Sequence, residues 1–410
     1  MEIVERLEVD LLLACARPRF DPTSNARVAE IITAGVDWTE LVALALRHGV
    51  APALLTAFAE PSSQPLVPAE IQTALTQYRD AAREQHAYLA TELHAILSAL
   101  ADEGISALPF KGGLLAEMLY GDLGQRQPGD LDFLVQPHHV SRACDVLVAR
   151  GYRDAYATAV PMTAVQHGLY RRYQCEYRFI RDHDGVVVEP HWALAASMLG
   201  IDLDYAAQFS RARRATFAGV PVSTHAPEDL LLLLCVHGAK HEWERLCWIR
   251  DVATMLERSA DIGLDVDLAL ARAREQGCAR LLLLGVEVAH RLLAAPLSTS
   301  LGDAISNDRG VGPLADDITK RLFVDDRPEL THVWVRWFPF KMHERVPNRA
   351  KYVARTLLLP RREHIEMLAL PAALAWLYYP LRWGHDYVAL PLWILTRPLR
   401  THRPTSKAVQ

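Results

Sequence analysis

Two carboxylates, a basic residue and a glycine pair lie within a short stretch, residues 111–135. Asp130 and Asp132 alternate with apolar residues in the run DLDFLV, so in a strand both acids share one face. Two ionised carboxylates held side by side repel each other unless a proton or a hard cation lies between them. The spacing therefore predicts a site for Mg²⁺, which suits oxygen ligands and phosphates.

The basic residue and the glycines lie just before a predicted helix, at the end of a predicted short strand, Ile105–Phe110. They are Lys111, Gly112 and Gly113, and the helix runs from Leu114 to about Tyr120. A glycine pair in such a turn lets the backbone approach a phosphate closely, and the start of the helix offers free N–H groups. The stretch therefore predicts a phosphate-binding turn beside the acids.

A third acid, Glu189, lies in the later run VVVEPH. In a strand over 186–191, Val187, Glu189 and His191 share one face. A second run, 175–180, is separated from it by Asp182-His183-Asp184-Gly185, and the Asp-Gly pair predicts a hairpin. Glu189 is thus a third candidate metal ligand.

Four blocks occur in order along the chain: KGG with Arg126, DLDFLV, VVVEPHW and HGAKHEWERLCWIRD. Over roughly residues 105–255 they resemble the nucleotidyltransferase superfamily with the polymerase-β-like catalytic fold, most closely an uncharacterised bacterial nucleotidyltransferase family. The first two blocks also resemble abortive-infection-type nucleotidyltransferase toxins. The resemblance implies an α+β fold, with a small mixed sheet and helices as its core, flanked by N- and C-terminal helical regions.

The resemblance also implies a chemistry: a nucleoside triphosphate donates its nucleoside monophosphate to an acceptor hydroxyl, and pyrophosphate leaves. The acceptor would be a small molecule, a peptide or a glycan intermediate. Asp130, Asp132 and Glu189 would be the catalytic residues and would bind two Mg²⁺ ions, while Gly112 and Gly113 would contact phosphate.

One departure from the superfamily lies in the turn, where many members carry Gly-Ser and this chain carries Gly-Gly. Phosphate contacts are then expected from backbone N–H groups and from Lys111, Arg126 or Lys240. His237 and His241 share a helical face with Lys240, and the resemblance implies that this face touches the nucleotide.

The two histidines also match the i, i+4 spacing of a zinc-binding pair, but Gly238 stands where a protease-type site has Glu. In a helix continuing past them, Asp251 lies on roughly the same side as His241. Asp251 is expected either to pair with Arg245 or Arg250 or to act in catalysis.

The rest of the chain must position these residues, and the sequence predicts four regions. The first is helical, with helices near 2–15, 24–35, 37–48 and from Pro68 to Ala101. The regions are 1–104, N-terminal and helical; 105–224, the catalytic core; 225–325, a helical region that closes the nucleotide cleft; and 326–410, basic, rich in aromatic residues and proline, and packed on the body.

Composition limits the class of protein. The six cysteines of the 410 residues are scattered, with no CxxC pair, which favours reduced thiols and a cytoplasmic location. The start, MEIVERLEVD, is acidic where a signal peptide would be basic, so secretion is not expected.

Charge is uneven along the chain. Residues 336–410 hold 13 Lys/Arg against 4 Asp/Glu, so this segment has a net charge of +9, whereas the net charge of the whole chain is −5. Its longest uncharged run, Met367–Leu381, has 15 residues, fewer than the ~20 that span a bilayer, so no transmembrane segment is expected. A peripheral membrane contact and nucleic-acid binding both stay open, but packing on the body is favoured over either.

Two other functions are compatible with the same blocks: a toxin-like transferase acting on tRNA, and a catalytically silent binding or scaffold protein that keeps the fold. The three carboxylates argue against the silent protein, because a site that does no chemistry has no use for acids that repel one another.

Overall fold

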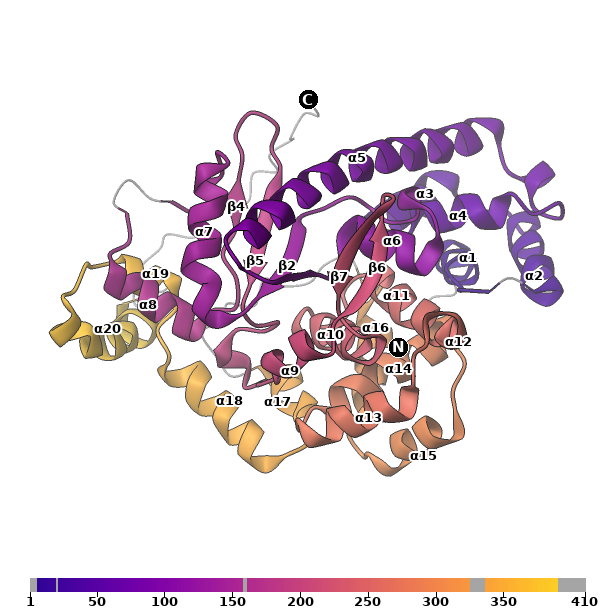
Figure 1. The fold of residues 1–410 in the computed structure, drawn as a ribbon. Coiled ribbons are helices and arrows are strands. Elements are labelled where there is room, and N and C mark those ends of the chain that lie inside the picture. The colour runs from indigo at the N-terminus through magenta and orange to yellow at the C-terminus, as the bar shows by residue number, and fades with distance from the viewer. Residues whose placement is uncertain (1–5, 20, 158–160, 325–335, 390–410) are drawn as a thin grey trace, which may run out of the picture.

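The computed structural model describes residues 6–19, 21–157, 161–324 and 336–389. In Figure 1 one long helix, α5, runs over a sheet, and most of the remaining helices form a body beneath it. The helices and strands, in chain order, are α1 (Leu7–Cys15), α2 (Pro22–Thr33), α3 (Trp38–Arg47), α4 (Ala51–Phe58), η1 (Gln64–Leu66), α5 (Ala69–Asp102), β1 (Ala107–Pro109), α6 (Gly112–Tyr120), η2 (Leu123–Gln125), β2 (Leu131–Val135), η3 (Pro137–His139), α7 (Val140–Ala149), β3 (Arg153–Asp154), α8 (Ala164–Tyr173), β4 (Phe179–Ile180), β5 (Val187–His191), η4 (Ser197–Leu199), α9 (Tyr205–Ser210), β6 (Arg213–Phe217), β7 (Val220–Thr224), α10 (Pro227–Lys240), α11 (Leu246–Glu257), α12 (Ser259–Ile262), α13 (Val266–Glu275), α14 (Ala279–Leu293), α15 (Thr299–Asn307), α16 (Val311–Arg321), α17 (Trp337–Met342), α18 (Val346–Leu358), α19 (Arg362–Glu366), η5 (Ala372–Leu377), α20 (Tyr378–Gly384) and η6 (His385–Ala389).

The central sheet has five strands in the order β1-β2-β5-β4-β3. β2 and β5 run parallel, and the other neighbours are antiparallel. The connection between the two parallel strands carries α7 and α8, and β6 and β7 form a separate hairpin. This small mixed sheet with flanking helices confirms the predicted α+β core.

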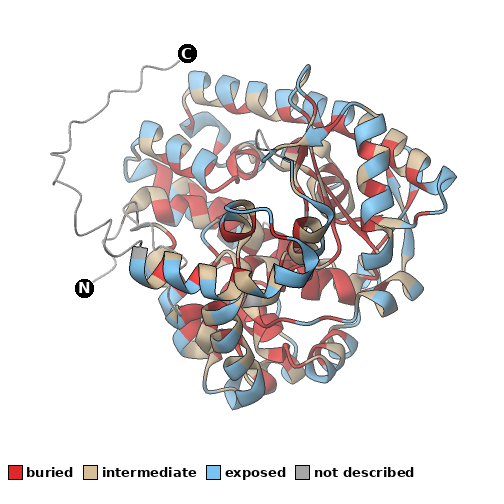
Figure 2. Ribbon diagram, turned by 90° about the vertical axis from the view of Figure 1, so that its left-hand side faces the viewer, coloured by how far each residue is buried: buried red, intermediate tan, exposed pale blue. Residues whose placement is uncertain are grey.

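The strand β2 separates two apolar cores, because alternate side chains point to opposite faces. Leu131, Phe133 and Val135 pack with residues of α5 and α7 in one cluster. Leu134 belongs to the other cluster, which extends through α10, α11 and α14. Figure 2 shows buried residues along the strands and on the inner sides of the surrounding helices. Asp132 therefore lies on the face opposite Phe133, as the alternation predicts.

The N-terminal helices form where the sequence predicts them, with one addition. The short helix α4 was not predicted, and Pro52 lies in its first turn, where a missing N–H costs nothing. Pro68 lies at the N-cap of α5 rather than inside its first turn. Gly104, with φ of +69°, follows the end of α5 as predicted. Residues 2–5 of the predicted first helix lie outside the described residues.

The predicted helix through His241 and Asp251 is wrong, because the chain turns between α10 and α11. Glu242 and Trp243 have φ values of +51° and +54°, and the Trp243 side chain is fully buried. A Cβ at Gly238 would lie 2.5 Å from the Trp243 ring, so only glycine fits there. The tryptophan folds back onto α10 and ends the helix.

The strand predicted over 175–180 is shorter than expected, since only Phe179 and Ile180 form β4. Pro190 faces this stretch from β5 and has no N–H to donate, although its carbonyl accepts from the Tyr177 N–H at 3.2 Å. The predicted hairpin turn is confirmed: Gly185 has φ of +71°, and its N–H donates to the carbonyl of Arg181 at 2.8 Å.

The C-terminal helices α17 to α20 lie against other parts of the chain: α18 contacts η4, and α19 contacts α8. Residues 325–335 and 390–410, at either end of this segment, lie outside the described residues. Across the described part of the chain, no helix combines the length and the apolar character needed to cross a bilayer.

Buried histidines predict an acid-sensitive stability. His225, just before α10, is 1% exposed, and burial lowers its pKa to about 4. The unfolded chain takes up this proton near pH 6.5 while the folded chain does not, so stability is complete above about pH 6.5 and falls as the pH drops toward 4. We expect His225→Phe to remove about 2 kcal/mol of this loss between pH 6.5 and pH 5, measured by urea unfolding.

The matched control is His183→Phe, since the His183 side chain is 72% exposed in the β4–β5 turn. That substitution should leave the pH dependence unchanged. If both variants changed the pH dependence of the free energy of unfolding equally, the loss of stability in acid could not be attributed to the burial of His225.

Candidate active site

Three carboxylates gather on one face of the sheet. Asp130 directly precedes β2, Asp132 lies within it, and Glu189 lies on β5. The parallel register pairs Asp132 with Glu189, so their side chains stand next to each other on the same face. The predicted acids therefore meet, although 59 residues separate Asp130 from Glu189 in sequence.

Two cations of the protein itself lie between these acids. Lys111 Nζ is 2.9 Å from Asp132 Oδ1. Arg178 Nη1 is 2.9 Å from Asp130 Oδ2 and 2.5 Å from Glu189 Oε1, so one guanidinium group bridges two of the three acids. The Arg178 side chain remains 33% exposed, the most accessible of these five.

A histidine and a fourth acid extend the cluster inward. His191 Nε2 lies 2.9 Å from Asp132 Oδ1 and 3.8 Å from Glu189 Oε2. Its other ring nitrogen, Nδ1, lies 3.1 Å from Glu176 Oε2, which also lies 3.4 Å from Lys240 Nζ. The His191 side chain is only 3% exposed, so a chain of polar contacts runs from Lys240 to Asp132 through a buried imidazole.

The charges in the cluster move its acids in opposite directions. Burial alone would raise the pKa of Asp132, but Lys111 and then His191 outweigh it and hold that pKa well below its usual range. Burial, and after it the surrounding carboxylates, raise the pKa of Glu189 to about 8. Asp132 is thus an ionised group, while Glu189 lacks enough positive charge around it.

This donor set fits a divalent cation. Ligand atoms of Asp132, Glu189 and His191 all lie within 4.8 Å of one another. Carboxylate oxygens are the ligands that Mg²⁺ takes, and a cation next to Glu189 would offset the repulsion that raises its pKa. Asp130 is not a member of this group, and Arg178 lies between it and Glu189.

The glycine turn lies at the edge of this cluster, and glycine suits its two positions for different physical reasons. Gly112 has φ of +57°, a conformation that side chains rarely adopt. A Cβ at Gly113 would lie 3.0 Å from both His86 Cδ2 and the Phe217 ring, so a side chain there would require these two rings to shift. The turn brings Lys111 into contact with Asp132.

Arg126 lies beside this turn, and its guanidinium group forms an ion pair. Its Nη2 lies 2.9 Å from Asp251 Oδ2, and its Nη1 donates to the carbonyl of Gly112 at 3.1 Å. Asp251 also accepts from the Tyr120 hydroxyl at 2.8 Å and is 1% exposed. The expected pairing of Asp251 with Arg245 or Arg250 is therefore wrong, and Arg126 supports the turn through a buried ion pair.

Of the residues predicted on α10, Lys240 reaches the cluster through Glu176. His237 and His241 pack against each other, with ring centroids 4.7 Å apart, and both lie within about 5 Å of the Trp248 ring. Burial, and then Lys111, lower the pKa of His237 well below its usual range, and burial lowers that of His241 to about 4. Neither belongs to a group of three metal-type ligands among the described residues.

Three members of the cluster were not singled out from the sequence: Glu176, Arg178 and His191. Each lies on the same face as a predicted acid, since residues 176, 178 and 180 alternate along one run and 187, 189 and 191 along the other. Pairing the two faces across the predicted hairpin would have brought Arg178 toward Glu189. The signal was therefore present as a period of two in each run.

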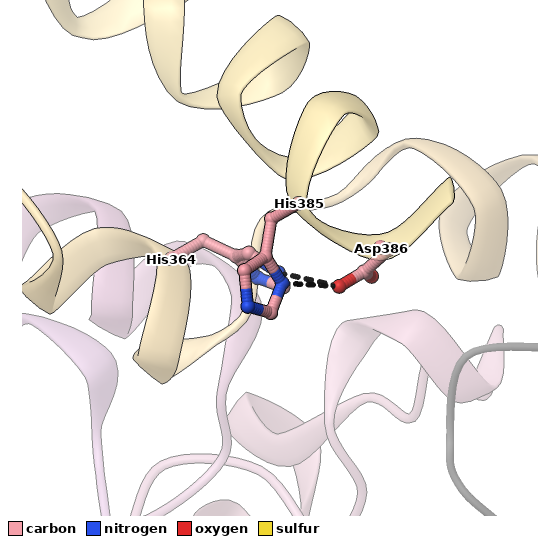
Figure 3. A group of neighbouring side chains, drawn as sticks. All are labelled: His364, His385 and Asp386. Carbon is pink, nitrogen blue, oxygen red and sulfur yellow. Dashed lines mark hydrogen bonds and ion pairs between the residues drawn. The ribbon is translucent and has the colours of Figure 1, made fainter. Parts of the chain in front are cut away.

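A second group of metal-type side chains lies far from this site in sequence: His364, His385 and Asp386 (Figure 3). Both imidazoles point at the same Asp386 carboxylate. Arg361 and Arg382 also contact that carboxylate, at 2.9 and 3.2 Å. Two guanidinium groups already neutralise it and would repel a metal ion, so this group is a buried polar network.

Comparison with known proteins gives one match. A family model described as an uncharacterised nucleotidyltransferase matches residues 34–294, which include all three acids, the glycine turn and α10. No curated protein and no solved structure matches the chain.

The buried pair predicts a structural cost for changes at Arg126. Arg126→Gln leaves the Asp251 carboxylate buried without its cation, and we expect a loss of about 3 to 5 kcal/mol in the free energy of unfolding by urea. The double variant Arg126→Gln/Asp251→Asn removes both charges and should recover most of this loss. Unchanged stability in the single variant would show that the arginine is not held by Asp251.

Proposed function

The chain belongs to an uncharacterised nucleotidyltransferase family, and we propose that it is a Mg²⁺-dependent enzyme that transfers a nucleoside monophosphate from a nucleoside triphosphate to an acceptor hydroxyl, releasing pyrophosphate. The observation that carries the proposal is the in-register placement of Asp132 and Glu189 on parallel strands, with Asp130 beside them and the Lys111 turn adjacent. The acceptor we propose is a small molecule, a peptide or a glycan intermediate.

Asp130, Asp132 and Glu189 would hold the metal ions. Bound there, Mg²⁺ would neutralise charge on the triphosphate and help to orient the attacking hydroxyl. Asp132 stays ionised because Lys111 and His191 lower its pKa. Glu189, the third acid of the set, would help to bind or deprotonate the acceptor hydroxyl.

The protein's own cations would then serve the phosphates. Lys111 and Arg178 each lie against an acid that would bind metal, so the arrival of metal frees their positive charge for the triphosphate oxygens. Arg178 is the better placed of the two to move, because its side chain is 33% exposed against 17% for Lys111. Bidentate contacts to phosphate suit a guanidinium group.

The double variant Asp130→Asn/Asp132→Asn tests the metal assignment. We expect Mg²⁺-dependent triphosphate binding to be lost and nucleotide transfer to fall by at least about a thousandfold, because positioning and charge stabilisation both depend on the metal. Calorimetry with Mg²⁺ and each of the four ribonucleoside triphosphates measures the binding. Labelled nucleotides incubated with a cell extract measure transfer, and label in RNA rather than in small molecules would identify a tRNA-directed enzyme.

Asp182→Asn is the matched control, since Asp182 is an exposed acid in the β4–β5 turn that pairs with Arg153. It should bind and transfer like the wild type. Retention of transfer by the double variant would sink the metal assignment, and absence of any triphosphate binding by the wild type would favour a silent protein that keeps the fold.

Arg178→Ala separates the two roles that we give this arginine. Without nucleotide, its loss removes a cation from two metal ligands, so Mg²⁺ or Mn²⁺ should bind about tenfold more tightly. Affinity for the triphosphate should fall instead, because a phosphate contact is gone. Calorimetry measures both, with Arg153→Ala on the neighbouring strand as the control. If the affinities for the metal ion and for the triphosphate changed in the same direction, the proposal that Arg178 moves from the acids to the triphosphate would be contradicted.

A further inference from the structure

The C-terminal part of the described chain exposes apolar residues where proteins usually expose polar ones. Between residues 346 and 388, each exposed position other than Glu363 is apolar, glycine or proline. The large side chains among them are 42–61% exposed after residue 366: Met367, Leu368, Leu374, Trp376, Trp383 and Val388. Single exposed apolar residues are common, but a continuous run of them is not.

The helix α18 shows the same property as a pattern. Val346, Ala350, Ala354 and Leu358 recur at intervals of four, so they share one face of the helix, and all four are exposed. Val346 is 71% exposed and Leu358 45%. In a helix packed on a protein core, such a stripe points inward. Here it points to the outside, and we call it, with the large residues after 366, the C-terminal apolar surface.

Two charged residues of the same segment are buried instead. Asp386 is 2% exposed and Arg382 is completely buried. Asp386 accepts from His364 Nε2 at 2.9 Å and Arg361 Nη2 at 2.9 Å, and Figure 3 shows both histidines directed at it. Arg382 also donates to the backbone carbonyls of Thr356 and Leu359. This network ties α18, α19 and α20 together from inside.

The segment therefore buries a charged network together with apolar residues such as Ile365 and Tyr378, and it leaves other large apolar residues on its outside. Removing apolar area from water is favourable, so an exposed surface of this kind is stabilised when it is covered. The elements that carry it lie together at the left of Figure 1, and α18 and α20 contact each other. The exposed apolar side chains of this surface would be more stable in contact with an apolar partner than with water.

Charge and residue type indicate what covers it. Residues 336–389 contain nine Lys/Arg against four Asp/Glu, an excess of positive charge. Beside the apolar stripe, the Arg345 side chain is 51% exposed, and Lys351, 38% exposed, pairs with Asp202 at 2.7 Å. Exposed tryptophans beside basic residues are typical of segments that lie in the interface of an anionic bilayer, where basic side chains meet lipid phosphates.

We propose that the C-terminal apolar surface binds the surface of an anionic lipid bilayer, with Trp376 and Trp383 inserted between the head groups. The chain lies on the bilayer rather than across it, since no described helix is long and apolar enough to span one. The proposal does not depend on the transfer reaction.

Vesicle sedimentation with the full-length protein tests it. We expect binding to vesicles of phosphatidylglycerol and phosphatidylcholine, and much weaker binding to phosphatidylcholine alone. Trp376→Glu/Trp383→Glu should lower the partition onto the mixed vesicles by at least about tenfold, because it places two charges in the interface. Both tryptophans are at least half exposed, so the thermal unfolding midpoint should not change.

The matched controls are two valines of nearly equal exposure. Val388 belongs to the surface and is 57% exposed, while Val148 lies on α7 and is 58% exposed. Val388→Glu should weaken vesicle binding, and Val148→Glu should not.

Three results would overturn the proposal. The wild type could fail to bind the mixed vesicles, or the tryptophan variant could bind them as the wild type does. A wild type that self-associates in sedimentation-velocity runs without binding vesicles, and becomes monomeric in the tryptophan variant, would instead identify the surface as a contact between two copies of this chain.

Discussion

The mutual repulsion of carboxylates on one face of β2 and β5 is the constraint on which the candidate site depends. The parallel register places Asp132 beside Glu189, and from within the strands His191 contacts Asp132. Two cations relieve the repulsion: Lys111, in the turn before α6, and Arg178, which directly precedes β4. The turn and the hairpin are therefore electrostatic parts of the site as well as connections between strands.

This constraint also explains the division of the sheet into two faces. Leu131, Phe133 and Val135 pack under α5 and α7, so that face has no room for charge. On the opposite face the acids meet Lys111, Arg178 and the buried His191, which lies between Asp132 and Glu176. Because side chains alternate along a strand, fixing the apolar residues fixes the acids as well. The site follows from the packing of the opposite face.

The part of the site that depends on local periodicity could be predicted from the sequence. Asp130 and Asp132 share a face because a strand repeats every two residues, whereas Glu189 joins them through the parallel pairing of β2 with β5. The contacts of Arg178 and Glu176 depend in addition on how the stretch before β4 pairs with β5 across the hairpin. Their stretch forms only a two-residue strand, and Pro190 opposite has no N–H to complete the ladder.

Contacts between distant segments account for the other differences. The partner of Asp251 is Arg126, 125 residues away, and no spacing along one helix could indicate it. The helix expected to reach Asp251 ends earlier because the Trp243 ring packs on Gly238, which is a tertiary contact. Helix propensity and spacing describe the elements well, but the choice among several charged partners is made only when the elements pack.

The C-terminal segment shows the same limit, because its sequence alone does not indicate that Arg382 and Asp386 are buried while Trp376 and Trp383 are exposed. The segment is also fastened to the core: Arg362 contacts Asp154 on the edge strand β3 at 3.4 Å, and Gln166 donates to the carbonyl of Ile365 at 2.6 Å. Since β3 belongs to the sheet that carries Glu189, a bilayer bound at the C-terminal apolar surface would fix the orientation of the acids relative to the membrane.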